Sequence, residues 1–123
     1  MFYSKKKNKS FNVWGNPNDK RCFLFSDDAA EALYLCMQQK KYDVINVGSN
    51  KEYKINELVK IIKKEMNFLG PIKWVNPDIK TIKRRNINLS RLSQIGFKEQ
   101  LSLQSGINKT ISWLKAYYKF ARK

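Results

Sequence analysis

Histidine is absent from this 123-residue sequence, and cysteine occurs only twice. Without histidine the chain cannot form a Cys/His zinc site or a serine or cysteine nucleophile activated by histidine. Cys22 and Cys36 both fall in apolar runs, so we expect them to be buried free thiols. The sequence therefore predicts no metal site and no catalytic residue of these kinds.

Glycine is also scarce, with five residues that lie far apart: Gly15, Gly48, Gly70, Gly96 and Gly106. A dinucleotide-binding βαβ unit needs closely spaced glycines, because the backbone must approach the pyrophosphate at the amino terminus of a helix. No two glycines of this sequence form Gly-x-Gly or Gly-x-x-Gly. We expect no nicotinamide cofactor to be bound by this chain alone.

Long apolar runs are missing as well. No run approaches the roughly 20 residues that span a bilayer, and no apolar stretch follows the first lysines. A hydrophobic content of 42% with 16 aromatic residues is typical of one packed domain. We expect a soluble cytoplasmic protein with no membrane partner.

Acidic residues number 10 against 25 basic ones, which gives a net charge of +15. Such a charge raises nucleic acid as a partner. The basic residues are 20 lysines and 5 arginines, mostly scattered, and arginine is the better reader of bases and phosphates. Most of the charge is interpreted as a solvated surface, and nucleic acid is the less favoured partner.

The apolar periodicity predicts an α/β chain, α+β-like in arrangement, with three or four short strands and three main helices. Strands are expected at 22–25, 42–47 and 72–75. Helices are expected over 27–40, from Asn56 to about Asn67, and from Ser102 onwards, with a short helix from Ser90 to Gly96. The buried face of the first helix is predicted to consist of Ala29, Ala30, Leu33, Cys36 and Met37.

Trp14 and Arg21 stand on either side of a turn rich in Asn, Pro and Asp. A planar aromatic ring beside a guanidinium could bind a ring that carries phosphates. The alternative from these residues alone is a packed tryptophan and a solvated arginine. Ser26 and Asp27 follow, and either could cap the next helix.

The order of several motifs resembles the carboxyl-terminal half of the NAD-dependent epimerase/dehydratase family, which belongs to the extended short-chain dehydrogenase/reductases. The motifs are Trp14-Gly15, Arg21 with Phe23, and the helix that begins Asp27-Asp28. The segments 45–49, 53–58, 77–78, 83–85, 88–92, 96–97 and 101–107 follow in the family's order. Together they cover about residues 11 to 118 and resemble most the GDP-L-fucose synthases.

The resemblance implies a substrate-binding carboxyl-terminal domain at 11–123 without the Rossmann half. Residues 1–10 would be a basic lead-in, the tail of an upstream helix. The complete enzyme would be an NAD(P)-dependent nucleotide-sugar epimerase/reductase that uses NADP or NAD. It would catalyse 3,5-epimerisation and reduction of a GDP-4-keto-6-deoxy sugar. Its partners would be a nucleotide-diphosphate sugar, with a GDP-sugar favoured, and the missing Rossmann half or a second copy in a homodimer.

The same resemblance implies substrate contacts by Trp14, Arg21 and Asp78, with Arg84 as a weaker contact to the diphosphate. Ile79 replaces the glycine that the family has after the aspartate, which leaves the orientation of Asp78 and the identity of the sugar open. No catalytic residue is assigned. Tyr3 and Lys7 have the Tyr-x-x-x-Lys spacing of the family's catalytic pair but lie far too close to Trp14.

Two other functions remain open. The chain could be a truncated remnant that is inactive in isolation, or a small basic protein that binds nucleic acid through Lys5 to Lys9, Arg84 and Arg85.

Overall fold

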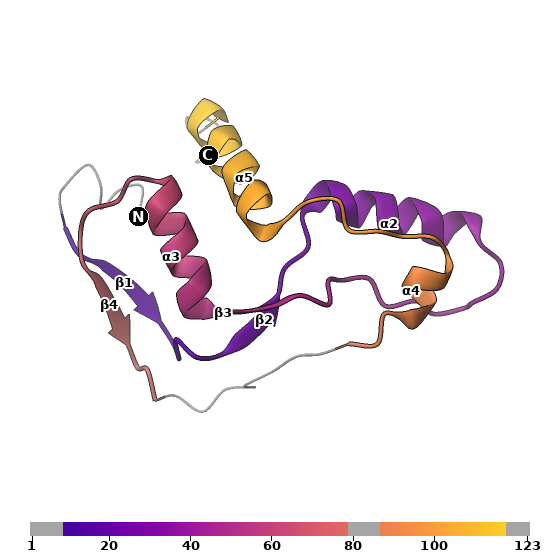
Figure 1. The fold of residues 1–123 in the computed structure, drawn as a ribbon, viewed down its shortest axis with the longest axis horizontal. Coiled ribbons are helices and arrows are strands. Elements are labelled where there is room, and N and C mark those ends of the chain that lie inside the picture. Colours follow the sequence, from indigo (N-terminus) through magenta and orange to yellow (C-terminus); the bar gives the residue numbers. More distant parts are fainter. Residues whose placement is uncertain (1–8, 79–86, 118–123) are drawn as a thin grey trace.

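The computed structural model describes residues 9–78 and 87–117. These residues form an α/β chain, as predicted (Figure 1). The four short strands are β1 (Phe11–Trp14), β2 (Lys20–Cys22), β3 (Glu52–Lys54) and β4 (Ile72–Val75). The helices of this part of the chain are α2 (Ser26–Gln38), α3 (Ile55–Glu65), α4 (Ser90–Gln94) and α5 (Leu103–Tyr117).

The strands pair two by two. β1 and β4 are parallel, with Phe11 opposite Ile72 and Trp14 opposite Val75. β2 and β3 are antiparallel, with Arg21 opposite Tyr53. The β1–β4 pair lies at one end of the molecule and α2 with α4 at the other, with α3 between them (Figure 1). In each pair, the two strands come from distant parts of the sequence.

The core consists of two apolar clusters. One buries Ala32, Leu92 and Phe97, so that it joins α2 to α4. The other buries Met66, Phe68 and Ile111 between the end of α3 and α5. Partly buried residues of β1 and β4 complete the second cluster, where the ring of Phe11 meets that of Phe68 edge to face with centroids 6.5 Å apart. The two clusters stabilise opposite ends of the molecule.

The predicted inner face of α2 is confirmed at Cys36 but wrong at Leu33 and Met37. Ala32 is fully buried, and Leu35 and Cys36 pack against the same cluster, whereas Leu33 and Met37 are 57% and 83% exposed. Periodicity defines a stripe of apolar residues but not which of two apolar stripes meets the core. The buried face was set by α4 and its neighbours, which are distant in sequence.

The structure confirms only some of the helix starts that the sequence predicts. Ser102 begins the last helix as predicted, since its Oγ accepts a hydrogen bond from the N–H of Ser105 (3.2 Å). The second helix begins at Ile55 and not after an Asn56 cap, because the Glu57 carboxylate accepts the N–H of Lys54 (2.8 Å). Neither Ser26 nor Asp27 caps α2, whose N-cap is Phe25 with no side-chain hydrogen bond.

The helix α3 ends at Glu65 with Met66 as its C-cap, close to the predicted end at about Asn67 and before the predicted stop at Gly70. Asn67 adopts a left-handed backbone with φ of 48°. The N–H of Phe68 then returns to the carbonyl of Lys63 at 3.0 Å, which satisfies a carbonyl left free at the helix end. Asparagine tolerates this conformation better than most residues, so no glycine is needed.

Two predicted strands differ from the observed ones. The strand predicted at 22–25 is observed as β2 at Lys20–Cys22, so it begins two residues and ends three residues earlier, because its pairing with β3 ends at Cys22. The segment 42–47 is not a strand in the described part of the chain, because no other strand pairs with it. Its side chains nevertheless alternate as in a strand, with Ile45 and Val47 packed on the first cluster and Val44 and Asn46 exposed.

Within the described residues, no helix is long and apolar enough to cross a membrane. Neither Cys22 nor Cys36 forms a disulfide with another described residue, as predicted, and both are half-buried, whereas burial was expected.

Candidate functional site

The carboxyl ends of β1 and β4 form one edge of the molecule, because the two strands are parallel and in register. Trp14 ends β1 with its side chain 61% exposed. The next residue, Gly15, donates its N–H to the carbonyl of Val75 (2.9 Å) and has φ of 103°, which favours glycine. On the other strand Asn76 follows Val75 with φ of 52°. Both strands thus turn away at the same level, directly after Trp14 and Val75.

The loop from Asn16 to Asp19 continues from this edge to β2. Asn16 accepts the N–H of Asn18 on its side-chain oxygen (2.8 Å), a local turn that asparagine favours. The carbonyls of Pro17 and Asp19 accept N–H groups from Asn56 and Ile55, at 3.0 and 2.9 Å. These donors belong to the first turn of α3, which lacks intrahelical partners. The loop is therefore held by the amino terminus of α3.

Arg21 lies in the middle of β2 with its side chain 27% exposed. Its Nη1 donates to the carbonyl of Lys20 (2.7 Å), and its Nη2 lies 3.5 Å from Oδ2 of Asp19. Asp19 is 7% exposed, so this ion pair is partly shielded from water. The guanidinium is held in place before any ligand arrives.

The structure brings Trp14 and Asp78 to the same edge. Asp78 is exposed and lies in the turn that follows β4. Arg21 lies one loop further along the chain from Trp14. Arg84 and the basic run that includes it lie outside the described residues.

Sequence reasoning missed Asp19 as the ionic partner of Arg21. The signal available was an acidic residue two positions before the arginine, at the start of a short strand. Residues i and i+2 point to the same side of an extended chain, so such a pair can meet. Burial of the aspartate could not be predicted, because it depends on α3 covering the loop.

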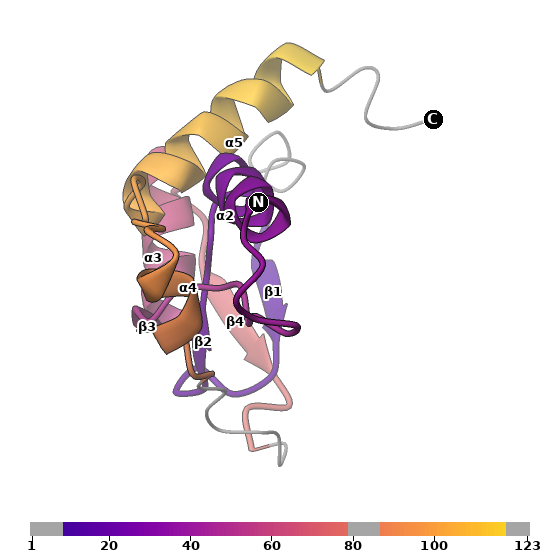
Figure 2. The same ribbon diagram turned by 90° about the vertical axis from the view of Figure 1, so that its right-hand side faces the viewer.

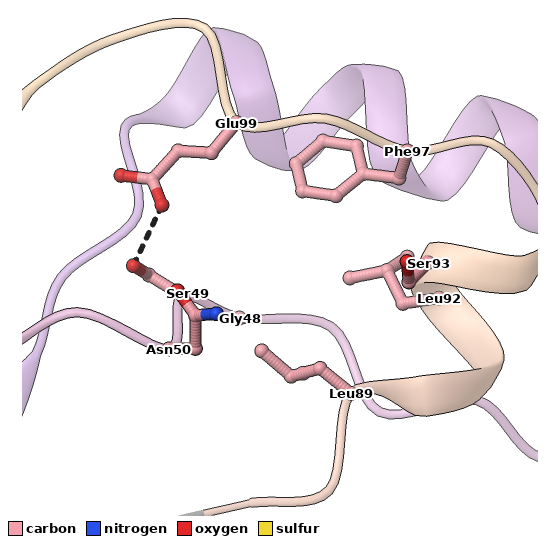
Figure 3. Close-up of a pocket in the computed structure, with 8 residues that line it drawn as sticks. All are labelled: Gly48, Ser49, Asn50, Leu89, Leu92, Ser93, Phe97 and Glu99. Atoms are coloured by element: carbon pink, nitrogen blue, oxygen red, sulfur yellow. Dashed lines mark hydrogen bonds between the residues drawn. The ribbon is translucent and has the colours of Figure 1, made fainter.

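Sequence reasoning also missed a cavity of about 140 Å³ between the turn after Val47 and α4 (Figure 3). Its lining comprises Gly48, Ser49, Asn50, Leu89, Leu92, Ser93, Phe97 and Glu99. Small-molecule sites usually measure about 300–1,000 Å³, so this cavity is too small for a nucleotide sugar. The only feature of the sequence that pointed to this cavity was the turn-forming run Gly48-Ser49-Asn50 in its wall.

The polar wall of this cavity is a hydrogen-bonded pair. Ser49, which is 3% exposed, donates its hydroxyl to Oε2 of Glu99 at 2.8 Å (Figure 3). The hydroxyl oxygen accepts the N–H of Lys51 (3.1 Å), and Lys51 Nζ lies 3.6 Å from Oε1 of Glu99. The arrangement joins the chain after Val47 to the segment before α5, which is a structural role.

Replacing Glu99 with alanine is expected to lower the free energy of unfolding by about 1–3 kcal/mol, because the buried Ser49 hydroxyl loses its acceptor. Urea denaturation followed by circular dichroism measures this loss. Glu31→Ala is the control, because Glu31 is an exposed carboxylate on α2 and should change stability by less than about 0.5 kcal/mol. Equal losses in the two variants would contradict the structural role of Glu99.

The described residues do not fit a resident metal or dinucleotide. No group of three or more His, Cys, Asp or Glu in residues 9–78 and 87–117 could hold a metal ion. The N-cap residues of α2, α3 and α4 are Phe25, Lys54 and Leu89, with no glycine turn before any of these helices. Gly106, in the first turn of α5, is covered by the ring of Phe25, which a Cβ there would approach to 3.1 Å. A pyrophosphate needs an open backbone at a helix start, and these helices do not offer one.

The fold is similar to part of a larger solved structure. The structure of a GDP-L-fucose synthetase from Naegleria fowleri bound to NADP is similar to 99% of this chain with a TM-score of 0.88. The sequence identity is 22%, and the match covers 38% of that protein's chain. This likeness establishes the fold.

Sequence comparisons agree with it. The sequence model of the NAD dependent epimerase/dehydratase family matches residues 1–48. A putative UDP-glucose 4-epimerase from Methanocaldococcus jannaschii is 30% identical over 89% of this chain and 35% of its own length. A putative GDP-L-fucose synthase from Arabidopsis thaliana is 32% identical over 82% of this chain and 31% of its own length. The predicted relationship of this chain to the NAD-dependent epimerase/dehydratase family is thus confirmed, and the chain spans about a third of the length of these curated relatives.

Proposed function

We propose that this chain forms the nucleotide-sugar-binding part of an NAD(P)-dependent sugar epimerase or reductase, with a GDP-sugar as the favoured substrate. The observation that carries the proposal is the shared edge of β1 and β4, where an exposed Trp14 lies beside the turn that contains Asp78. In α/β proteins ligands bind outside the carboxyl ends of parallel strands. Relatives named as GDP-L-fucose synthases support the choice of substrate.

Each of the proposed substrate-binding side chains has a chemical role that its type supports. The face of Trp14 can stack on a planar base, since every base has a π face. The planar fork of Arg21 matches the oxygens of a diphosphate, and the carboxylate of Asp78 can accept hydrogen bonds from sugar hydroxyls. Arg84, which lies outside the described residues, is proposed as a second diphosphate contact.

The position of Arg21 suits this role because its guanidinium is already oriented by Asp19 and the carbonyl of Lys20. A side chain that is ordered before binding loses less conformational entropy when the ligand arrives. The ion pair at 3.5 Å is longer than a close charge-assisted hydrogen bond, so a diphosphate can attract the same guanidinium.

The nicotinamide cofactor of the complete enzyme, NADP or NAD, would be bound by polypeptide outside these described residues. It would supply the hydride for reduction of a keto sugar. The role of the chain described here is to bind and orient the sugar nucleotide.

The test uses a fusion of this chain with the part of the Naegleria fowleri synthetase that it does not match. Isothermal titration calorimetry with GDP-glucose and UDP-glucose compares two ligands that differ only in the base. We expect saturable binding, at least about tenfold tighter for GDP-glucose, which corresponds to about 1.4 kcal/mol. Absence of binding to both ligands would refute the proposed function, and a preference for UDP-glucose would refute the GDP assignment.

A further inference from the structure

One face of the β2–β3 pair, which lies between the β1–β4 pair and α2 (Figure 1), carries Arg21 and Tyr53. These two residues are directly opposite each other in the antiparallel register. Side chains at opposite positions project from the same face, with Cβ atoms about 4.5–5.5 Å apart. Successive residues of a strand alternate between the faces, so Lys20 and Lys54, which also pair, project from the other face. Tyr53 is therefore the residue of β3 that shares a face with Arg21.

The hydroxyl of Tyr53 has no hydrogen-bond partner among the described residues, although the side chain is half-buried. Its ring likewise makes no aromatic or cation–π contact with residues 9–78 and 87–117. A tyrosine that is partly buried usually forms a hydrogen bond through its hydroxyl. Phenylalanine would bury the same ring, so packing does not account for the hydroxyl. This O–H group is a donor that a ligand can use.

The guanidinium of Arg21 is turned toward residues 19 and 20 of its own strand and loop. Its Nη2 lies 3.5 Å from Oδ2 of Asp19, and its Nη1 donates to the carbonyl of Lys20 (2.7 Å). The ring of Tyr53 is therefore not covered by the guanidinium. A phosphate bound at Arg21 can accept a hydrogen bond from the phenol as well, because the two side chains begin only about 4.5–5.5 Å apart at Cβ.

The ion pair with Asp19 also gives a reason for a second donor at this position. A sugar nucleotide carries negative charge on both of its phosphates, whereas the positive charge of Arg21 is partly offset by the buried Asp19 carboxylate. An O–H donor forms a strong hydrogen bond with an ionised oxygen and adds no positive charge that the carboxylate would also attract. The phenol of Tyr53 thus supplements the guanidinium without competing for Asp19.

We propose that Tyr53 is a further substrate-binding residue, whose hydroxyl donates a hydrogen bond to an oxygen of the diphosphate that Arg21 binds. The ligand class is a nucleoside diphosphate, with or without its sugar. The inference rests on the proposed function, because it adds a second donor to the same diphosphate site. Tyr53 contributes to the binding of the phosphates and not of the base, which is proposed to stack on Trp14.

The first test introduces Tyr53→Phe into the fused protein, which keeps the ring and removes only the hydroxyl. Affinity for GDP, measured by isothermal titration calorimetry, should fall by at least about tenfold, since a hydrogen bond to a charged oxygen is lost. Affinity for guanosine, which has no phosphate, should stay the same. Tyr117→Phe is the matched control and should change neither affinity. Tyr117 is 51% exposed at the end of α5, which extends away from β2 and β3 (Figure 1 and Figure 2).

The second test adds inorganic pyrophosphate to this chain alone, at fixed ionic strength and without nucleotide or sugar. In nuclear magnetic resonance spectra, the Cζ signal of Tyr53 and the Nε signal of Arg21 should shift along one saturation curve. The Tyr53 signal is assigned by its loss in Tyr53→Phe. Arg21→Ala should abolish the shift of Tyr53, because the phosphate is then no longer held beside the phenol.

Several results would overturn the role of Tyr53. They are unchanged GDP affinity in Tyr53→Phe, an equal loss of guanosine affinity, an equal effect of Tyr117→Phe, and a pyrophosphate titration that does not shift the Tyr53 signal. If the unsubstituted fusion binds neither GDP nor a sugar nucleotide, the proposed function fails. The pyrophosphate titration still decides the role of Tyr53 in that case, so the two failures are distinguishable.

Discussion

Replacing Arg21 with alanine is expected to weaken the binding of GDP-glucose to the fused protein by about ten- to a hundredfold. A charge-assisted bidentate contact between arginine and a phosphate oxygen pair contributes roughly 1.5–3 kcal/mol, which corresponds to this range. The guanidinium is half-buried and oriented by Asp19 before binding, so its loss is not replaced by a neighbouring solvated charge. Isothermal titration calorimetry at fixed ionic strength measures the effect.

Lys20→Ala is the control for general positive charge. The Lys20 side chain is exposed on the same strand, and alanine keeps the backbone carbonyl that accepts the hydrogen bond from Arg21. A solvated lysine contributes only screened charge, so affinity should change less than about twofold. Arg21→Lys should fall between the two, because it keeps the charge and loses the planar fork. Equal losses for Arg21→Ala and Lys20→Ala would rule out a formed diphosphate site at Arg21.

Replacing Phe68 with alanine is expected to lower the free energy of unfolding by about 3–5 kcal/mol. Phe68 is 2% exposed in the cluster with Met66 and Ile111, and its ring contacts that of Phe11 edge to face. Alanine would leave a cavity between α3, α5 and the β1–β4 pair. Because small domains have a stability of only about 5–15 kcal/mol, the unfolding midpoint in urea should fall steeply.

The adjacent residue provides the control. Leu69 is 91% exposed, so Leu69→Ala removes an apolar side chain of similar hydrophobicity that buries almost nothing. Its effect should stay within about 0.5 kcal/mol. Similar losses in Phe68→Ala and Leu69→Ala would show that this cluster is not packed as described.

The existence of the helices could be predicted from sequence because their apolar residues repeat at three and four positions. The start of α5 was predicted at Ser102 because its cap is made by a side chain three residues from its target. The face of α2 could not be predicted in the same way, since both of its faces carry apolar residues. Its buried face was decided by contact of Ala32 with Leu92 and Phe97, which lie some sixty residues further along the chain.

The candidate site likewise combines features that were predictable from the sequence with contacts that only the tertiary structure forms. The residue types at Trp14 and Arg21, and the turn between them, were evident from the sequence. The meeting of Trp14 with the turn that contains Asp78 depends on the parallel pairing of β1 with β4, whose residues are 61 positions apart. The ion pair of Arg21 with a buried Asp19 depends on α3 binding the loop through its first N–H groups.

The sequence by itself predicted the relationship to the NAD-dependent epimerase/dehydratase family, the α/β class, the approximate positions of the helices and the lack of closely spaced glycines. These properties depend on residue type and on spacing within a few positions. Only the tertiary structure decided which helix face is buried, which extended segments pair, and that residues 42–47 have no pairing partner within the described part of the chain. A strand exists only where a second segment donates and accepts its backbone hydrogen bonds, and that partner is not encoded in the local sequence.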